Sequence, residues 1–95
     1  MKQRELFMAR KHYVYILECK DGSLYTGYTT DITARLKKHE SGKGAKYTRG
    51  RGPLKLRYEE ALDSKTTAMK REYMIKQLSP SKKWELIETY MKGGE

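Results

Sequence analysis

A few side chains that suit a phosphate-bearing ligand are spread along this chain. Tyr15 and Tyr25 carry hydroxyl groups that donate or accept a hydrogen bond, and a tyrosine with a lowered pKa can act as a base. Arg35 presents a fork of donors that matches a phosphate, and His39, four residues later, can supply a proton. Glu72 is a lone carboxylate, which suits Mg²⁺ when waters and phosphate oxygens complete the coordination.

Each of these residues also has an ordinary structural interpretation. Tyrosines in strands most often pack against the sheet, and a single helix arginine most often points into solvent. A lone histidine is more often structural than catalytic. Glu72 stands four residues before Lys76, which is the spacing of a common helical ion pair. Residue type alone therefore leaves both interpretations open, and the predicted elements have to decide between them.

The two tyrosines fall on two predicted strands joined by a hairpin. Residues 12–19 and 24–30 are rich in β-branched and aromatic side chains, and Asp21-Gly22 is a hairpin signal. A two-residue loop would put Tyr15 and Tyr25 on opposite faces. A three-residue loop over 20–22, with glycine last in the left-handed conformation, would pair Tyr15 with Gly27 and put both tyrosines on one face. We prefer the three-residue loop because of the position of the glycine.

Arg35 and His39 share one stripe of the first predicted helix. Asp31 can cap this helix, which we expect to run from Ile32 to about Ser41. Ile32 and Leu36 form its inward pair. After Gly42 and Gly44 comes a basic loop, and a third strand is predicted over 54–62 with inward alternation at Leu54, Leu56 and Tyr58.

Two further helices are predicted in the last third of the chain. Ser64 can cap the first, which runs to about Leu78 and carries Glu72 at the edge of its apolar stripe. Ser79-Pro80 opens the second, which runs to about Met91, with a predicted buried set of Trp84, Ile87 and Met91. The predicted fold is therefore α/β of the α+β type: a three-stranded antiparallel sheet flanked by helices, in the order β-β-α-β-α-α. Residues 12–92 form one domain, preceded by a flexible extension over 1–11.

Charge is concentrated in the middle of the chain. The net charge is +9, and residues 31–58 contribute nine basic and two acidic side chains to it. A basic block with aromatic residues is the electrostatic footprint of a nucleic-acid-binding protein. The single cysteine, Cys19, allows no internal disulfide and suits a reducing cytoplasm, and no apolar run is long enough to cross a membrane. We expect phosphate contacts from the basic loop at Lys43, Lys46, Tyr47, Arg49 and Arg51.

The order of these residues resembles the GIY-YIG endonuclease superfamily, and most closely its small single-domain bacterial subgroup. Tyr13-Val14-Tyr15 and Tyr25-Thr26-Gly27 stand ten residues apart between their tyrosines, as in the two-part motif of that superfamily. The resemblance continues through Arg35, His39, the stretch 42–48 and Arg71-Glu72, and covers about residues 12–79.

The resemblance implies a role for each matching residue. Tyr15 and Tyr25 would be the motif tyrosines, with Tyr25 as general base and Tyr15 orienting the water or the phosphate. Gly27 would close the motif where a side chain would crowd the site. Arg35 would stabilise the transition state, and Glu72 would hold one divalent metal ion, usually Mg²⁺. Matches to auxiliary site residues fall on His39 and Tyr47, and the implied substrate is DNA.

The chain departs from the family pattern in three ways. The first motif has Tyr-Val-Tyr instead of Gly-Ile-Tyr, although the catalytic tyrosine is kept. Larger family members carry an asparagine after the glutamate, and this chain contains no asparagine. In this family an attached domain commonly supplies target choice, so a lone module would have weak sequence preference or would depend on a protein partner.

Three functions follow from these observations. The first is a metal-dependent DNA endonuclease with a role in repair or recombination. A second is a non-catalytic nucleic-acid-binding or adaptor module on the same fold, because fold does not fix function. The third is a basic structural protein, for example one associated with the ribosome. Convergence of Tyr15, Tyr25, Arg35, His39 and Glu72 on one patch would favour the first.

Overall fold

The computed structural model describes residues 11–44 and 48–93, so the extension predicted before the domain lies outside the described residues apart from Lys11. The described elements follow the predicted order β-β-α-β-α-α, and the predicted fold class is confirmed. Their bounds are β1 His12–Glu18, β2 Leu24–Thr29, α2 Ile32–Glu40, β3 Lys55–Leu62, α3 Lys65–Lys76 and α4 Pro80–Gly93.

The sheet has the order β2-β1-β3, and both pairings are antiparallel. The hairpin between β1 and β2 closes with a three-residue loop, in which the Cys19 amide donates to the Ser23 carbonyl at 2.8 Å. Gly22 has a φ of +86°, the left-handed conformation expected for the last loop residue. Tyr15 therefore pairs with Gly27, and the predicted register is confirmed.

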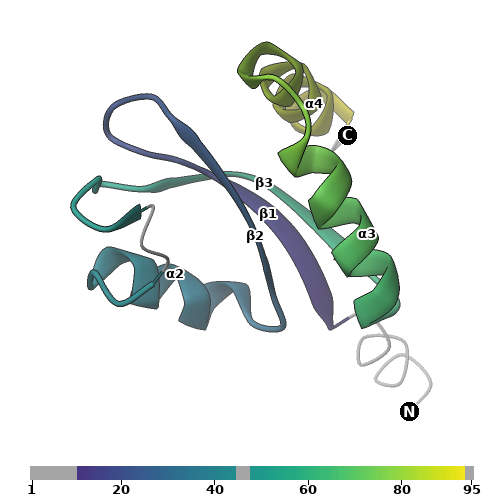
Figure 1. The fold of residues 1–95 in the computed structure, drawn as a ribbon, viewed down its shortest axis with the longest axis horizontal. Helices are drawn as coiled ribbons and strands as arrows, with labels where there is room; N and C mark the ends of the chain where they lie inside the picture. The colour runs from purple at the N-terminus through teal and green to yellow at the C-terminus, as the bar shows by residue number, and fades with distance from the viewer. Residues whose placement is uncertain (1–10, 45–47, 94–95) are drawn as a thin grey trace.

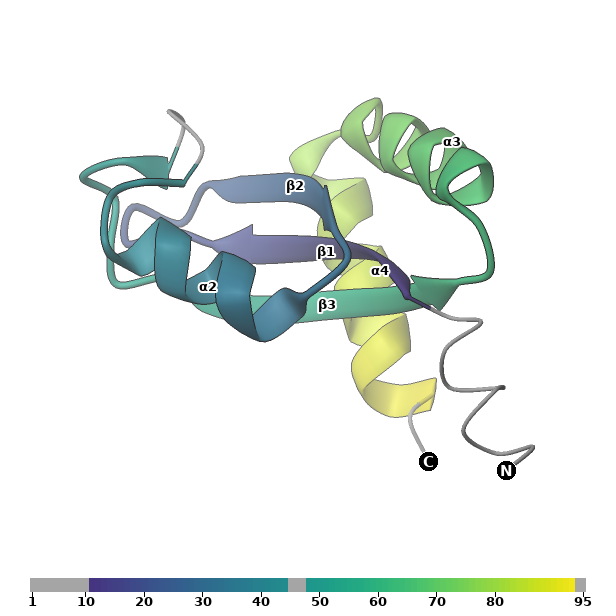
Figure 2. The same ribbon diagram turned by 90° about the horizontal axis from the view of Figure 1, so that it is seen from below.

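Helices cover both faces of the sheet (Figures 1 and 2). Helix α2 lies on one face, and α3 and α4 lie on the other. Because neighbouring strand residues point to opposite faces, β1 supplies both layers of the core. Val14 and Ile16 pack with Ala68, Ile75 and Ile87 of α3 and α4. Tyr15, Leu17 and Cys19 pack with Leu54 on the face covered by α2, where Ile32 and Leu36 join them as the predicted inward pair.

Two helices begin at the predicted caps. Oδ1 of Asp31 accepts the amide of Ala34 at 3.0 Å, and Oγ of Ser64 accepts the amide of Thr67 at 3.1 Å. Each bond satisfies a backbone donor that the first helical turn leaves without a partner. None of the helices in the described part of the chain is long and apolar enough to cross a membrane.

The expected alternation in β3 is wrong after its start. Ile16 pairs with Tyr58 and Leu17 with Leu56, so Arg57 is an extra residue in β3 and forms a bulge. Leu56 and Tyr58 consequently face opposite layers of the core. The Arg57 guanidinium donates from Nε to Oε1 of Glu18 at 2.7 Å, which ties the bulge to the end of β1.

The expected burial of Met91 is also wrong, since this side chain is 65% exposed. Ile87 is fully buried and Trp84 is partly buried, as expected. The end of α4 extends beyond β3 (Figure 2), and residues 91 and 92 are exposed there. The ring of Tyr90, the preceding residue, still lies 5.1 Å from that of Tyr58 on β3.

Candidate active site

Tyr15, Tyr25 and His39 form one aromatic cluster on the face covered by α2. Tyr15 is 1% exposed, and its hydroxyl lies 2.9 Å from Nε2 of His39. The Tyr25 ring stands 6.3 Å from that of Tyr15 and 5.3 Å from that of His39. The three-residue loop makes this possible, because it places both tyrosines on the same face of the sheet.

Gly27 leaves the space that the Tyr15 ring occupies. A Cβ atom at position 27 would lie 2.5 Å from the Tyr15 hydroxyl oxygen and 2.9 Å from Cε2 of Tyr25. Both distances are shorter than ordinary van der Waals contacts. The glycine therefore lets the Tyr15 side chain cross from the central strand over β2, which is an edge strand of the described sheet.

Arg35 and His39 reach the tyrosines from consecutive turns of α2. Arg35 lines a small depression against Tyr15 together with Ile32 and Leu36. Burial raises the pKa of Tyr15, and Tyr25 raises it further, while the charge of Arg35 opposes the shift. Burial and the charge of Arg35 lower the pKa of His39. At neutral pH the buried pair is therefore an uncharged phenol and an uncharged imidazole.

Glu72 lies in the helix layer on the opposite face of the sheet from the aromatic cluster. It lies on α3, which packs on β2 and β1. Its charge contributes to raising the pKa of Tyr15. Its side chain is 18% exposed, and Oε2 lies 3.4 Å from Nζ of Lys76. The ordinary ion pair is thus present, and the carboxylate also lies within electrostatic reach of the tyrosine.

Glu72 is also the residue expected to hold a metal ion. Among the described residues, no three or more histidine, cysteine, aspartate or glutamate side chains gather into a metal-binding group. A lone carboxylate leaves most coordination positions to water and to substrate phosphate oxygens, which is the usual arrangement for Mg²⁺. The donor set therefore fits one magnesium ion, provided that Lys76 turns away from the carboxylate.

Thr48 forms a hydrogen bond with His39, and Gly44 leaves room for its ring. Neither residue was predicted from the sequence to belong to the site. The Thr48 side chain is buried, and its Oγ1 lies 2.8 Å from Nδ1 of His39. A Cβ atom at position 44 would lie 2.5 Å from the same nitrogen. Both residues belong to the stretch 42–48 of the family resemblance, which was the available signal for them.

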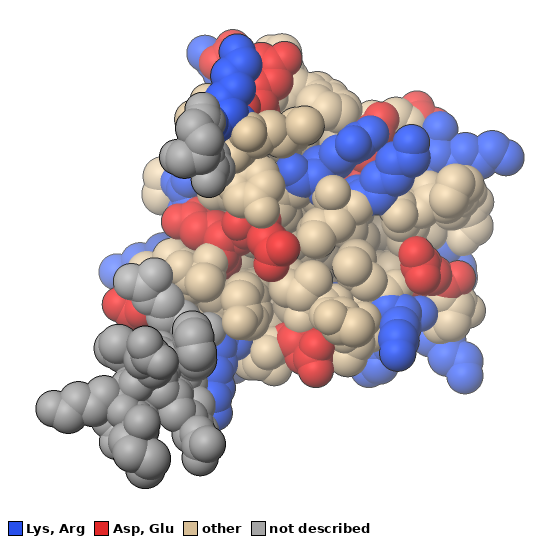
Figure 3. All heavy atoms as spheres, turned by 180° about the vertical axis from the view of Figure 1, so that it is seen from behind, with Lys and Arg blue, Asp and Glu red and all other residues tan. Residues whose placement is uncertain are grey.

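In the described part of the basic loop, two cations are exposed and a third, Arg51, forms an ion pair with the β1–β2 hairpin. Lys43 and Arg49 are exposed, whereas Lys46 and Tyr47 lie outside the described residues. Nη1 of Arg51 lies 2.7 Å from Oδ2 of Asp21 and 3.3 Å from Oγ of Ser23. Figure 3 shows several lysine and arginine side chains close together across the upper right of the face seen from behind.

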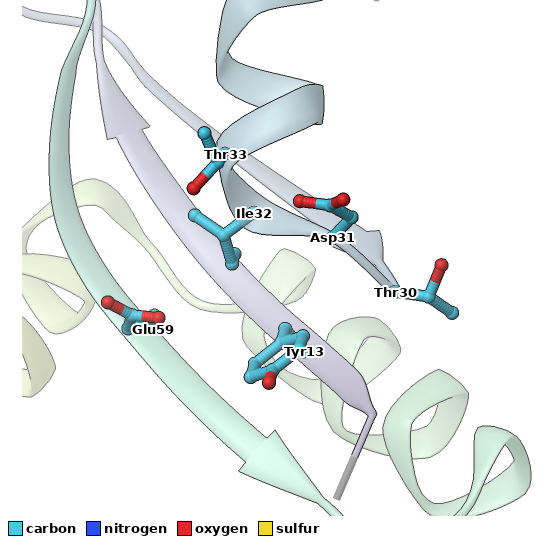
Figure 4. Close-up of a pocket in the computed structure, with 6 residues that line it drawn as sticks. All are labelled: Tyr13, Thr30, Asp31, Ile32, Thr33 and Glu59. Atoms are coloured by element: carbon cyan, nitrogen blue, oxygen red, sulfur yellow. The ribbon is translucent and has the colours of Figure 1, made fainter. Parts of the chain in front are cut away.

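A cavity of about 240 Å³ opens elsewhere on the molecule (Figure 4). The start of α2 and strands β1 and β3 line it with Tyr13, Thr30, Asp31, Ile32, Thr33 and Glu59. None of the five predicted catalytic residues is among them. Its two carboxylates would repel a phosphate, so this cavity does not suit the ligand that the aromatic cluster would take.

The chain is similar to known proteins over most of its length. The family model described as GIY-YIG catalytic domain matches residues 11–85. The UPF0213 protein BH0048 of Halalkalibacterium halodurans is 64% identical over 83 residues, which is 87% of this chain and 86% of that protein. The UPF0213 protein VNG_2274C of Halobacterium salinarum is 60% identical over 76 residues, which is 80% of this chain and 99% of that protein.

Two solved structures share the fold. The solution NMR structure of the UPF0213 protein BH0048 from Bacillus halodurans aligns with a TM-score of 0.54 at 65% identity, over 81% of this chain and 82% of that one. The solution NMR structure of EF2693 from E. faecalis aligns with a TM-score of 0.60 at 40% identity, over 84% of this chain and 85% of that one. With the family model spanning most of its length, the chain belongs to the GIY-YIG catalytic domain family.

Proposed function

We propose that this protein is a metal-dependent endonuclease that hydrolyses phosphodiester bonds in DNA, with a role in repair or recombination in the cytoplasm. The observation that carries the proposal is the buried Tyr15–His39 hydrogen bond, with Tyr25 against the imidazole and Arg35 beside Tyr15. A protein partner would supply target choice to this single domain.

Each side chain has a role that follows from its position. Arg35 would bind the phosphate through its guanidinium and stabilise the charge of the transition state. Tyr25, which is partly exposed, would act in its phenolate form as the base that takes the proton of the attacking water, and it would then release that proton to solvent. Tyr15 keeps its own proton because burial raises its pKa, so it would orient the water or the phosphate instead of acting as a base.

Glu72 would hold one Mg²⁺ ion through its carboxylate, in exchange for the ion pair with Lys76. When bound, the ion supplies positive charge that stabilises the phosphate and the leaving oxygen. His39 would keep the Tyr15 hydroxyl in place through Nε2, while Thr48 holds the other ring nitrogen.

A non-catalytic nucleic-acid-binding module is the second candidate, and the ion pair between Glu72 and Lys76 favours it. A carboxylate neutralised by a lysine binds a cation less readily than a free one. The chain also lacks the asparagine that larger family members carry after the glutamate. Both candidates require DNA binding, and cleavage separates them.

The deciding experiment incubates the purified protein with supercoiled and branched DNA, with and without Mg²⁺. Glu72→Gln and Tyr25→Phe should both abolish cleavage and leave DNA binding in place. Glu85→Gln is the matched control, because Glu85 is an exposed helix carboxylate paired with Lys82 at 3.6 Å. A wild-type protein that binds these DNAs and never cuts them would refute the nuclease and leave the binding module.

A further inference from the structure

A second cavity, of about 150 Å³, lies between the hairpin and the junction of α3 with α4. Gly22, Ser23 and Leu24 line one side, and Leu78, Pro80 and Lys83 line the other. Lys83 is the only charged side chain among these described residues. The cavity therefore combines an apolar wall with a single cation.

The ammonium group of Lys83 lacks an anionic partner among the described residues. Its neighbour Lys82 pairs with Glu85 at 3.6 Å, but no described carboxylate pairs with Lys83. Burial and the positive charge of Lys76 lower the pKa of Lys83. Burying a cation costs solvation free energy, and a second positive charge nearby adds repulsion. A bound anion would reduce both of these costs.

Lys76 connects this cavity with the candidate active site. Its Nζ lies 3.4 Å from Oε2 of Glu72, and its charge also acts on Lys83. Glu72 in turn acts on Tyr15. Lys76 therefore pairs with Glu72 of the candidate active site and also acts electrostatically on Lys83 in the cavity.

We propose that Lys83, helped by Lys76, binds a backbone phosphate of the DNA strand being cut. The proposal rests on the proposed function for the identity of the strand. A lysine ammonium with three donors suits a phosphate as a point charge. Leu24, Leu78 and Pro80 provide an apolar wall against which a deoxyribose could pack.

Salt-dependent DNA binding tests this subsite without any cleavage. We would measure the affinity for a short duplex in EDTA at several salt concentrations, for the wild type, Lys83→Gln, Lys83→Arg and Lys82→Gln. Lys83→Gln should weaken binding and reduce the slope of log K against log [salt] by about 0.9, the value of one phosphate contact. Lys83→Arg should restore the slope. Lys82→Gln should leave it unchanged, because Lys82 does not line the cavity.

An NMR titration of the wild type tests the subsite without depending on the folding of any variant. A 5′-phosphorylated thymidine dinucleotide should shift the amide signals of Ser23, Leu24 and Leu78. In the salt experiment, the subsite would be overturned by equal slopes for the wild type and Lys83→Gln, by an equal reduction of the slope in Lys82→Gln, or by a wild type that does not bind DNA. In the NMR titration, unshifted amide signals would overturn it. A slope difference in this assay, together with no cleavage in the Mg²⁺ assay described above, would uphold the subsite and refute the nuclease, so the two failures are distinguishable.

Discussion

The Tyr15 hydroxyl and Nε2 of His39 meet at 2.9 Å, and both side chains are almost completely buried. A neutral imidazole has one nitrogen that donates and one that accepts. The role of Nδ1 in its own hydrogen bond is therefore coupled to whether Tyr15 donates or accepts. The partner of Nδ1 is the Thr48 hydroxyl, at 2.8 Å.

Replacing Thr48 should accordingly affect Tyr15 through the histidine. Thr48→Val keeps the shape and removes the hydroxyl, and we expect it to lower the free energy of unfolding by about 1–3 kcal/mol because the buried Nδ1 loses this hydrogen bond. Cleavage should fall as well. Thr48→Ser keeps the hydroxyl and is the matched control. Urea unfolding and the ¹⁵N shifts of His39 measure both effects, and identical shifts in Thr48→Val and the wild type would contradict the link.

The stability of the protein should depend on the protonation of His39. Burial lowers its pKa in the folded state below the ordinary value of about 6.5, so below that pH the unfolded chain binds more protons than the folded one. The free energy of unfolding should therefore decrease as the pH falls below about 6.5. Urea unfolding from pH 5 to 8 measures this slope.

The matched variants for the pH experiment use the two histidines of the chain. His39→Gln should flatten the slope between pH 5 and 6.5. His12→Gln is the control, because it removes the other histidine, at the start of β1 where it stacks on Tyr28, and leaves the Tyr15–His39 pair in place. An unchanged slope in His39→Gln would show that the pH dependence arises from other groups.

Gly27→Ala should disturb the two tyrosines. The added Cβ would lie 2.5 Å from the Tyr15 hydroxyl oxygen, so the ring has to move, and overpacking of this kind costs about 1–3 kcal/mol. We expect a lower melting temperature and at least a tenfold slower cleavage. Gly52→Ala is the control, since nothing lies within 4 Å of the Cβ it would add. Full activity in Gly27→Ala would mean that the position of Tyr15 does not matter for cleavage.

Arg35→Lys tests whether cleavage needs the planar guanidinium of Arg35 or only its positive charge. Lysine keeps the positive charge and loses the planar fork, so transition-state stabilisation should weaken and kcat should fall roughly a hundredfold. KM should change much less. Arg49→Lys, at an exposed position of the basic loop, should leave kcat near the wild-type value. Single-turnover kinetics measure the difference, and an equal change in both variants would argue against a role of Arg35 in the chemical step.

Local signals predicted most of the fold. Gly22 at the end of a three-residue loop was enough to predict the register that brings Tyr15 opposite Gly27. Asp31 and Ser64 marked the starts of α2 and α3, because a capping side chain bonds to the backbone three residues away. Features that depend on residues close together in the chain can therefore be predicted from the sequence.

The features that were missed depend on distant contacts. The bulge at Arg57 is set by pairing with β1 and by the ion pair with Glu18, and strand periodicity cannot show either. Met91 falls on the apolar stripe of α4, yet its exposure depends on where the sheet ends. The bond from Thr48 to His39 spans nine residues across a helix end, so no regular spacing points to it.

The position of β2 at an edge of the sheet has a consequence for the shape of the substrate. Tyr25 and Gly27 lie on this strand, and the Tyr15 ring crosses over it, so the aromatic cluster stands at a border and not in a closed chamber. A polymer can pass along a border in both directions without threading a free end into the protein. The proposed nuclease would therefore act in the interior of a long strand or a closed circle, where no terminus exists.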